Sequence, residues 1–142
     1  MKKYIPAEIE AKWQRKWKED KIFTPDIHEA KKPYYALMMF PYPSGEGLHV
    51  GNMLPFTAVD IVARFKRMQG FDVFEPIGLD SFGIHTENYA LKVNKHPEKV
   101  TQERSERFYG QLMAIGDSYD WTRLVETHRP DYYKWTQWIF LQ

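Results

Sequence analysis

Phe-Pro-Tyr-Pro-Ser-Gly-Glu-Gly-Leu-His-Val-Gly-Asn, residues 40–52, is the stretch of sequence that decides the fold of this chain. An apolar, β-rich run at residues 34–40 leads into it, and a helix-forming segment begins at His49. A strand, a glycine loop and a helix N-terminus in succession direct free backbone N–H groups and the positive end of the helix dipole at one point, which favours a bound phosphate. We therefore expect a nucleotide-binding loop, to which His49 and Asn52 add side-chain donors.

The sequence on either side of this loop predicts a βαβ unit. Residues 34–40 form the first strand, and their nearly continuous apolar character is typical of a strand covered on both faces. Residues 52–69 form the crossover helix, with Pro55 in its first turn, where proline is tolerated, and Gly70 closing its C-terminus. Residues 71–76 form the second strand, parallel to the first. The predicted fold class is therefore α/β, with parallel strands joined by crossover helices.

A second loop, at residues 77–88, follows the second strand in the same way that residues 41–52 follow the first. Ligands of parallel α/β sheets bind beyond the carboxyl ends of the strands. We therefore expect both loops to face one crevice.

The N-terminal segment predicts an amphipathic helix at residues 7–20. Ile9, Trp13 and Trp17 recur at the spacing of one helix face, and basic side chains surround them. We interpret this as a docking helix packed on the main domain, and a basic face for RNA is the alternative. Prolines and lysines up to residue 33 mark a connector.

The second half of the chain reads as mostly helical. Residues 86–95 and 98–115 form helices that are separated at His96-Pro97, and Gly116 ends the second of them. Residues 117–121 form a turn that enters an extended stretch, and a last helix begins at about Pro130.

Composition narrows the functional classes. The chain has 142 residues, a formal net charge of +1 and no cysteine, so it predicts neither a strong electrostatic field for nucleic acid nor a disulfide framework or zinc knuckle. No apolar run approaches a membrane span, and we expect a cytoplasmic protein without a membrane partner. Aromatic residues make up 16% of the chain, more than one small core buries, which indicates a further packing partner.

Several motifs in order carry a resemblance to a known family. Residues 41–45 (Pro-Tyr-Pro-Ser-Gly) and 48–52 (Leu-His-Val-Gly-Asn) resemble the first signature of class I aminoacyl-tRNA synthetases, and the first of these motifs is similar to the leucine-specific branch. Residues 76–88 (Pro-Ile-Gly-Leu-Asp-Ser-Phe-Gly-Ile-His-Thr-Glu-Asn) resemble the next landmark of that family. Residues 131–138 fit the helix that leads out of the same half-domain.

The resemblance implies a particular organisation. Residues 34–142 would form the first half of a class I synthetase Rossmann-like (HUP-type) nucleotide-binding domain, after an N-terminal helix and connector at residues 1–33. The chain would end before the connective and editing insertion, and the rest of the catalytic domain would be its packing partner. Alone, this chain is then expected to be inactive or very weak as an enzyme.

The resemblance also implies the reaction and its participants. Leucine is activated by ATP, a substrate that carries Mg²⁺, and the leucyl group passes to tRNA(Leu). His49 and Asn52 would be the catalytic residues, because they donate hydrogen bonds to the phosphates and the reaction needs no side-chain nucleophile. The family usually has a second histidine where this chain has Asn52, whose amide donates but carries no charge. The ATP-binding residues implied are Pro43, Ser44, Gly45, Gly47, His49, Gly51 and Asn52.

The same resemblance implies an amino-acid site. Asp80 would bind the α-ammonium group, because a cation in a partly dry cleft requires a paired charge. The alternative for Asp80 is a cap on the helix that follows. Phe40 and Tyr42 would form the wall of the leucine pocket, with Phe40 alternatively in the core. The backbone of Met39 and Phe40 would contact the ammonium group, and His85 would be a further ligand contact.

Other interpretations stay open at this point. An isoleucine- or valine-type relative would carry Pro-Pro-Pro-Asn-x-Thr-Gly in place of residues 40–45, and a methionine-type enzyme is a further class I candidate. A small nucleotidyltransferase would not need the motifs at residues 76–88 and 131–138. A non-catalytic fragment that binds a nucleotide or a partner chain is the alternative of a different class.

Overall fold

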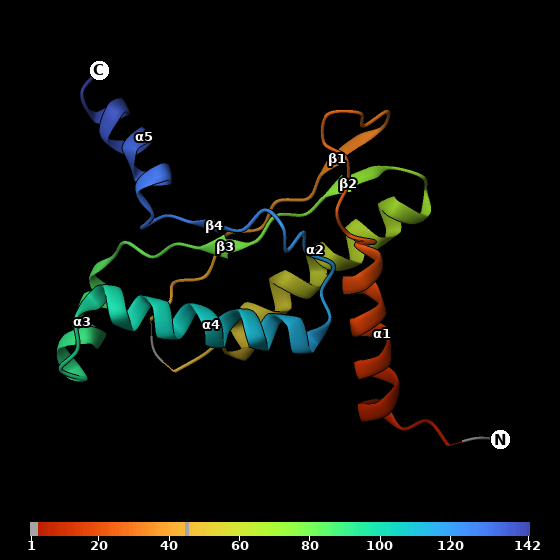
Figure 1. The fold of residues 1–142 in the computed structure, drawn as a ribbon, viewed down its shortest axis with the longest axis horizontal. Coiled ribbons are helices and arrows are strands. Elements are labelled where there is room, and N and C mark those ends of the chain that lie inside the picture. Colours follow the sequence, from red (N-terminus) through yellow and green to blue (C-terminus); the bar gives the residue numbers. More distant parts are fainter. Residues whose placement is uncertain (1–2, 45) are drawn as a thin grey trace.

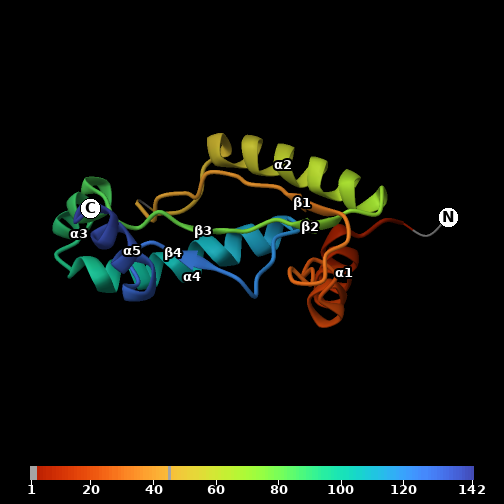
Figure 2. The ribbon, with the colours of Figure 1, turned by 90° about the horizontal axis from the view of Figure 1, so that it is seen from above.

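The computed structural model describes residues 3–44 and 46–142, which form a layered α/β arrangement. Strands run along the middle, α2 covers one face, and α1 and α4 lie on the other face (Figure 1 and Figure 2). In chain order the elements are α1 (Pro6–Asp20), β1 (Pro33–Tyr35), α2 (Val50–Met68), β2 (Asp72–Phe74), β3 (Gly78–Leu79), α3 (Ile84–Lys92), α4 (Pro97–Ile115), β4 (Val125–Glu126) and α5 (Pro130–Phe140).

A single extended segment, residues 72–80, organises the strand layer. At its start β2 pairs in parallel with β1, with Tyr34 opposite Val73. At its end β3 pairs in parallel with β4, with Leu79 opposite Glu126. The predicted parallel pairing of the first two strands is confirmed, and the same segment also serves a second parallel ladder that the sequence analysis did not assign.

The first strand is much shorter than the predicted residues 34–40. The ladder ends after Tyr35, although the N–H of Ala36 still donates to the carbonyl of Phe74. The expectation of a strand covered on both faces is wrong for the described residues, because Leu37 is 57% exposed and Met39 is 80% exposed. The prolines that follow remove backbone donors, so the apolar run continues as extended chain rather than as a ladder.

Helix α2 confirms the predicted crossover. It connects two parallel strands and buries Phe56 and Ala63 against the layer. Pro55 lies in the second turn, not the first as predicted, so its missing N–H leaves the carbonyl of Gly51 without that helical partner. Gly70 follows the helix end with a φ of 78°, the left-handed backbone that glycine adopts readily.

The remaining helices lie close to their predicted positions. Helix α3 ends at Lys92, earlier than the predicted residue 95, and α4 begins at Pro97 after the His96 N-cap. Gly116 ends α4 with a φ of 85°.

Helix α1 contacts the main domain as predicted: Nε2 of Gln14 donates to the carbonyl of Ala114 at 3.0 Å, and the Arg64 guanidinium lies 5.2 Å from the ring centroid of Trp17. Trp13 of the predicted docking face is still 43% exposed. No helix in the described part of the chain is both long enough and apolar enough to cross a membrane.

Two apolar clusters form the core, and α2 contributes one residue to each. The larger one joins Phe56, Ile77, Leu112 and Tyr119, all almost fully buried. The smaller one joins Ala36, Ala63 and Val73. The larger cluster supports the loops, because the half-buried side chains of Phe40 and Leu48 pack against it.

Candidate functional site

The N-terminus of α2 is closed by a reciprocal pair of residues. His49 is the N-cap with an extended backbone, and its carbonyl accepts from the N–H of Asn52 at 2.8 Å. In return, the N–H of His49 donates to Oδ1 of Asn52 at 3.1 Å. The Asn52 oxygen therefore serves the helix cap, which leaves its amide group as the part that can donate to a ligand.

Gly51 makes room for the histidine ring. A Cβ atom at this position would lie 2.9 Å from Nδ1 of His49, closer than side-chain atoms pack. The imidazole therefore lies against the backbone of the first helical turn, where the helix dipole favours negative charge. His49 itself is exposed and open to a ligand.

The loop before this helix is held in place by a residue of another helix, α4. Pro43 is fully buried and Ser44 is half-buried, whereas Gly45 lies outside the described residues. The N–H of Leu48 donates to Oε1 of Gln111 on α4 at 2.9 Å. A Cβ atom on Gly47 would lie 2.8 Å from both Oε1 and Nε2 of the same glutamine, so a side chain at this position would displace the amide group.

The second loop is joined directly to the first. The N–H of Asp80, just after β3, donates to the carbonyl of Pro41 at 3.0 Å. The next N–H, of Ser81, donates to the hydroxyl of Thr127 at 2.8 Å. Asp80 does not cap the following helix, because the N-cap of α3 is Gly83 and makes no side-chain hydrogen bond.

Gly78 allows the close approach that brings these segments together. A Cβ atom on Gly78 would lie 1.9 Å from the carbonyl oxygen of Val125, and 3.0 Å from the ring of Phe40. Phe40 is thus packed between the core and β3, in agreement with its alternative core interpretation. Its neighbour Met39 points its side chain largely into solvent.

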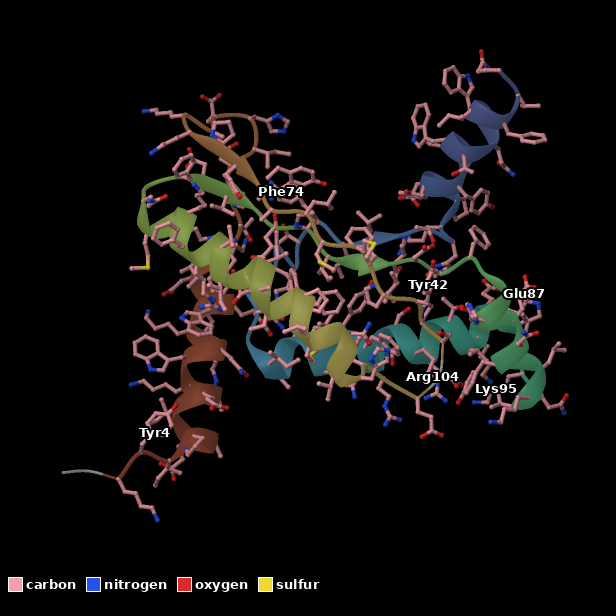
Figure 3. All side chains as sticks on the ribbon, turned by 180° about the vertical axis from the view of Figure 1, so that it is seen from behind. Tyr4, Tyr42, Phe74, Glu87, Lys95 and Arg104 are labelled. Carbon is pink, nitrogen blue, oxygen red and sulfur yellow. The ribbon has the colours of Figure 1, made fainter. Side chains whose placement is uncertain are left out.

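Tyr42 and His85 lie side by side although they are far apart in sequence. Their ring centroids are 6.1 Å apart, and both side chains are exposed. Tyr42 lies where the connection from β1 to α2 passes close to α3, the helix that carries Glu87 (Figure 3). The structure thus brings His85 next to one predicted pocket residue.

Sequence reasoning missed the residues that hold the loops from a distance. Gln111 and Thr127 contact the two loops from α4 and from the end of β4. Tyr109 adds a hydroxyl that donates to Glu126 at 3.2 Å, beside the same ladder. No local motif marks these residues, because their partners lie 17 to 63 residues away in the sequence.

A buried ionic network lies behind the site and was also not predicted. Asp60 accepts from Nε of Arg64 at 2.7 Å and from the N–H of Ser118 at 2.7 Å. The hydroxyl of Ser118 donates to Glu75 at 2.7 Å, and Arg67 lies 3.6 Å from the same carboxylate. The network connects α2, the end of β2 and the segment after α4.

Burial perturbs the carboxylates of this network. Desolvation is the main cause that raises the pKa of Glu75 from 4.5 to about 7, and Asp60 adds to it. Desolvation and Asp60 likewise raise the pKa of Asp117 from 3.8 to about 6. These groups are fully or almost fully buried, so they act on stability rather than on a ligand.

An open groove of about 590 Å³ lies elsewhere, between α1 and the end of α4. Aromatic side chains such as Trp17 and Trp121 line it, together with lysines of α1. Neither signature loop contributes to it. The groove is therefore separate from the two loops.

The two loops together offer the parts of a nucleotide site. A helix N-terminus with an exposed histidine and an amide donor can donate to a phosphate group. The Asp80 carboxylate on the adjoining loop can pair with an ammonium group. The structure is thus that of an α/β protein with parallel strands and an exposed histidine at the N-terminus of its crossover helix. The family model of the class I tRNA synthetases (M) matches residues 34–142, and the chain belongs to this family.

Within the family, the chain is similar to leucine–tRNA ligases. The chain is 51% identical over all of its length to the leucine–tRNA ligase of Alkaliphilus oremlandii. It is 50% identical over 97% of its length to the leucine–tRNA ligase of Protochlamydia amoebophila. The chain spans only 18% and 16% of these two relatives.

Solved structures agree with this similarity. The LeuRS of Agrobacterium radiobacter K84, in a ternary complex with tRNA and LeuAMS, matches with a TM-score of 0.91 and 37% identity. That match covers 98% of this chain and 18% of the other. The methionyl-tRNA synthetase of Mycobacterium tuberculosis with methionyl-adenylate matches with a TM-score of 0.61 and 26% identity, over 72% of this chain and 20% of the other.

Proposed function

We propose that this chain forms part of a leucine–tRNA ligase and supplies the phosphate-binding and ammonium-binding half of its activation site. Residues 34–142 would be the first half of the Rossmann-like nucleotide-binding domain, and residues 1–33 its N-terminal helix and connector. The similarity to leucine–tRNA ligases over the whole chain supports this specificity. The remaining half of the domain is a required packing partner, and a cytoplasmic location follows from the proposed role in translation.

In the proposed first step, a carboxylate oxygen of leucine attacks the α-phosphorus of ATP. The new P–O bond gives leucyl-adenylate, and the bond to the β-phosphate breaks to release pyrophosphate with its Mg²⁺. His49 and the amide of Asn52 donate to the phosphate oxygens as negative charge develops on them. In the second step, the leucyl group passes to a hydroxyl of the terminal adenosine of tRNA(Leu), and AMP leaves.

The hydrogen bond from Asp80 to the carbonyl of Pro41 is the observation that carries the proposal. It ties the ammonium-binding loop to the phosphate-binding loop through one backbone contact of 3.0 Å. Two substrates that must react with each other need their binding groups on one rigid frame, because orientation accounts for much of the rate. Tyr42 and His85 border the same region and are the proposed wall of the side-chain pocket.

Methionine is the second candidate substrate. The structure with methionyl-adenylate matches this fold at 26% identity over 72% of the chain, which supports the same activation chemistry with another amino acid. Leucine ranks first because the similarity to leucine–tRNA ligases is higher and covers all of the chain. The competing non-catalytic role, nucleotide binding alone, predicts ATP binding without any exchange.

The proposal is tested by amino-acid-dependent ATP–pyrophosphate exchange with the protein that contains this chain. We expect leucine to support exchange at least about 100-fold better than isoleucine, valine or methionine, and His49→Ala and Asp80→Asn to lower it at least about 100-fold. His28→Ala and Asp131→Asn are matched controls at exposed positions and should retain activity. Exchange with methionine alone, or exchange that survives both site variants, would contradict the proposal.

A further inference from the structure

We propose that Gln111 on α4 is a positioning residue for ATP, which holds the phosphate-binding loop in its competent conformation. The inference rests on the proposed function of this loop. Gln111 does not belong to either signature motif, and it lies 63 residues beyond the backbone group that it binds. Its role is therefore to act through the loop rather than on the substrate.

Two independent contacts carry the inference. Oε1 of Gln111 accepts from the N–H of Leu48 at 2.9 Å in a half-buried position. The oxygen and nitrogen atoms of the same carboxamide lie so close to Gly47 that a Cβ there would lie 2.8 Å from both Oε1 and Nε2. One side chain thus fixes two successive loop residues, immediately before the His49 N-cap.

The surroundings make Gln111 a rigid support. Its neighbour Leu112 is fully buried in the larger core cluster, and the side chain of Leu48 packs against that cluster. Leu48 is consequently held twice, by its side chain in the core and by its N–H on Gln111. A helix N-terminus binds phosphate well only if the preceding loop keeps the N–H groups pointed at the ligand.

The same geometry predicts different effects of Gln111 on the binding of ATP and of leucine. The loop that carries Asp80 is held by the Pro41 carbonyl and the Thr127 hydroxyl, and Gln111 makes neither of these contacts. Loss of the Gln111 acceptor should therefore raise the KM for ATP and lower kcat, and leave the KM for leucine nearly unchanged. A merely structural role of Gln111 in α4 would not separate the two substrates.

The first test compares Gln111→Met, which keeps length but removes the acceptor, with Gln102→Met at an exposed position of the same helix. In ATP–pyrophosphate exchange we expect Gln111→Met to lower kcat/KM for ATP about 10- to 100-fold, with less than a twofold change in the KM for leucine. Gln111→Glu keeps an oxygen acceptor and should recover part of the loss. Equal effects on both substrates, or the same kinetics as Gln102→Met, would overturn the proposal.

A second test uses the contact with Gly47. Gly47→Ala collides with the Gln111 amide, so Gln111→Ala in the same molecule should relieve the collision. We expect the double variant to lose several-fold less activity than the product of the two single losses. Strictly multiplicative losses would show that the two residues do not act on one another.

A third measurement does not depend on catalysis. Hydrogen exchange of the Leu48 amide in the ligand-free protein should become about 10-fold faster in Gln111→Met and stay unchanged in Gln102→Met. If hydrogen exchange of Leu48 becomes faster in Gln111→Met but the wild type shows no ATP–pyrophosphate exchange, the contact is supported and the proposed function is refuted. Unchanged protection of Leu48 would refute the positioning role itself.

Discussion

Single glycines determine how closely the chain can approach itself around the proposed site. Gly47 lies under the Gln111 amide, Gly51 under the His49 ring, and Gly78 against the Val125 carbonyl. None of these three positions has the left-handed backbone that requires glycine. The requirement is space, which a substitution tests directly.

Gly51→Ala is the sharpest test at the residue scale. The added methyl group would lie 2.9 Å from Nδ1 of His49 and should displace the imidazole. Alanine favours helices by up to about 1 kcal/mol over glycine, so stability should stay equal or rise. We expect kcat/KM for ATP in pyrophosphate exchange to fall at least about 10-fold while thermal unfolding is not lowered; undiminished exchange would contradict the placement of the ring.

The local part of the site could be predicted from sequence. His49 and Asn52 follow a proline-glycine loop and begin a helix, and this order alone places them at a helix mouth. Gln111 and Thr127 could not be predicted, because an isolated polar residue on a helix or after a strand carries no sign of its distant partner. The position of Asp80 beside Pro41 required the strand pairing to be known.

At the scale of elements, the short strands are held in place by parallel pairing with two different partners. The central segment, residues 72–80, pairs with β1 at one end and with β4 at the other. The prediction of a long first strand was wrong because an apolar run does not reveal where its pairing partner ends. The parallel order was predictable, since a crossover helix of this length joins parallel strands.

Gly78→Ala should break the β3–β4 ladder. Its Cβ would lie 1.9 Å from the Val125 carbonyl oxygen, a backbone atom that cannot move aside without loss of the pairing. We expect a loss of about 1–3 kcal/mol in the free energy of unfolding. Gly110→Ala, on α4 with open space around it, is the matched control and should stabilise slightly; equal urea midpoints for the two variants would contradict the assignment.

At the scale of the whole molecule, the buried ionic network connects the same segments as the larger apolar cluster and adds α1 to them. Arg64 extends it to α1, because its guanidinium lies 5.2 Å from the ring centroid of Trp17 and donates to the carbonyl of Gly116 at 2.6 Å. The sequence predicted a docking helix but not this anchor. An arginine within an amphipathic helix ordinarily faces solvent.

The network predicts how stability depends on pH. The pKa of Glu75 is raised from 4.5 to about 7 in the folded state, so the folded protein holds this proton more tightly than the unfolded chain. The resulting stabilisation is complete below about pH 4.5 and is lost as pH rises through 7. It amounts to about 3 kcal/mol at most.

Glu75→Gln should remove this dependence. Denaturant unfolding at pH 5 and pH 8 should show a smaller loss of stability in the variant than in the wild type. A remaining slope is expected from Asp117, whose pKa is raised to about 6. Glu106→Gln, at an exposed position of α4, should retain the full slope of the wild type, and a wild type without any slope in this range would refute the prediction.

The reciprocal cap at the start of α2 also determines how the hydrogen-bond donors of the proposed site depend on pH. Because the Asn52 oxygen is committed to the N–H of His49, the orientation of its carboxamide is decided before any nucleotide arrives. An amide offers its hydrogens at every pH, whereas an imidazole in the same place gains or loses one near neutrality. In the proposed enzyme, the hydrogens that residue 52 offers to a nucleotide are consequently the same at every pH, which a histidine at this position could not provide.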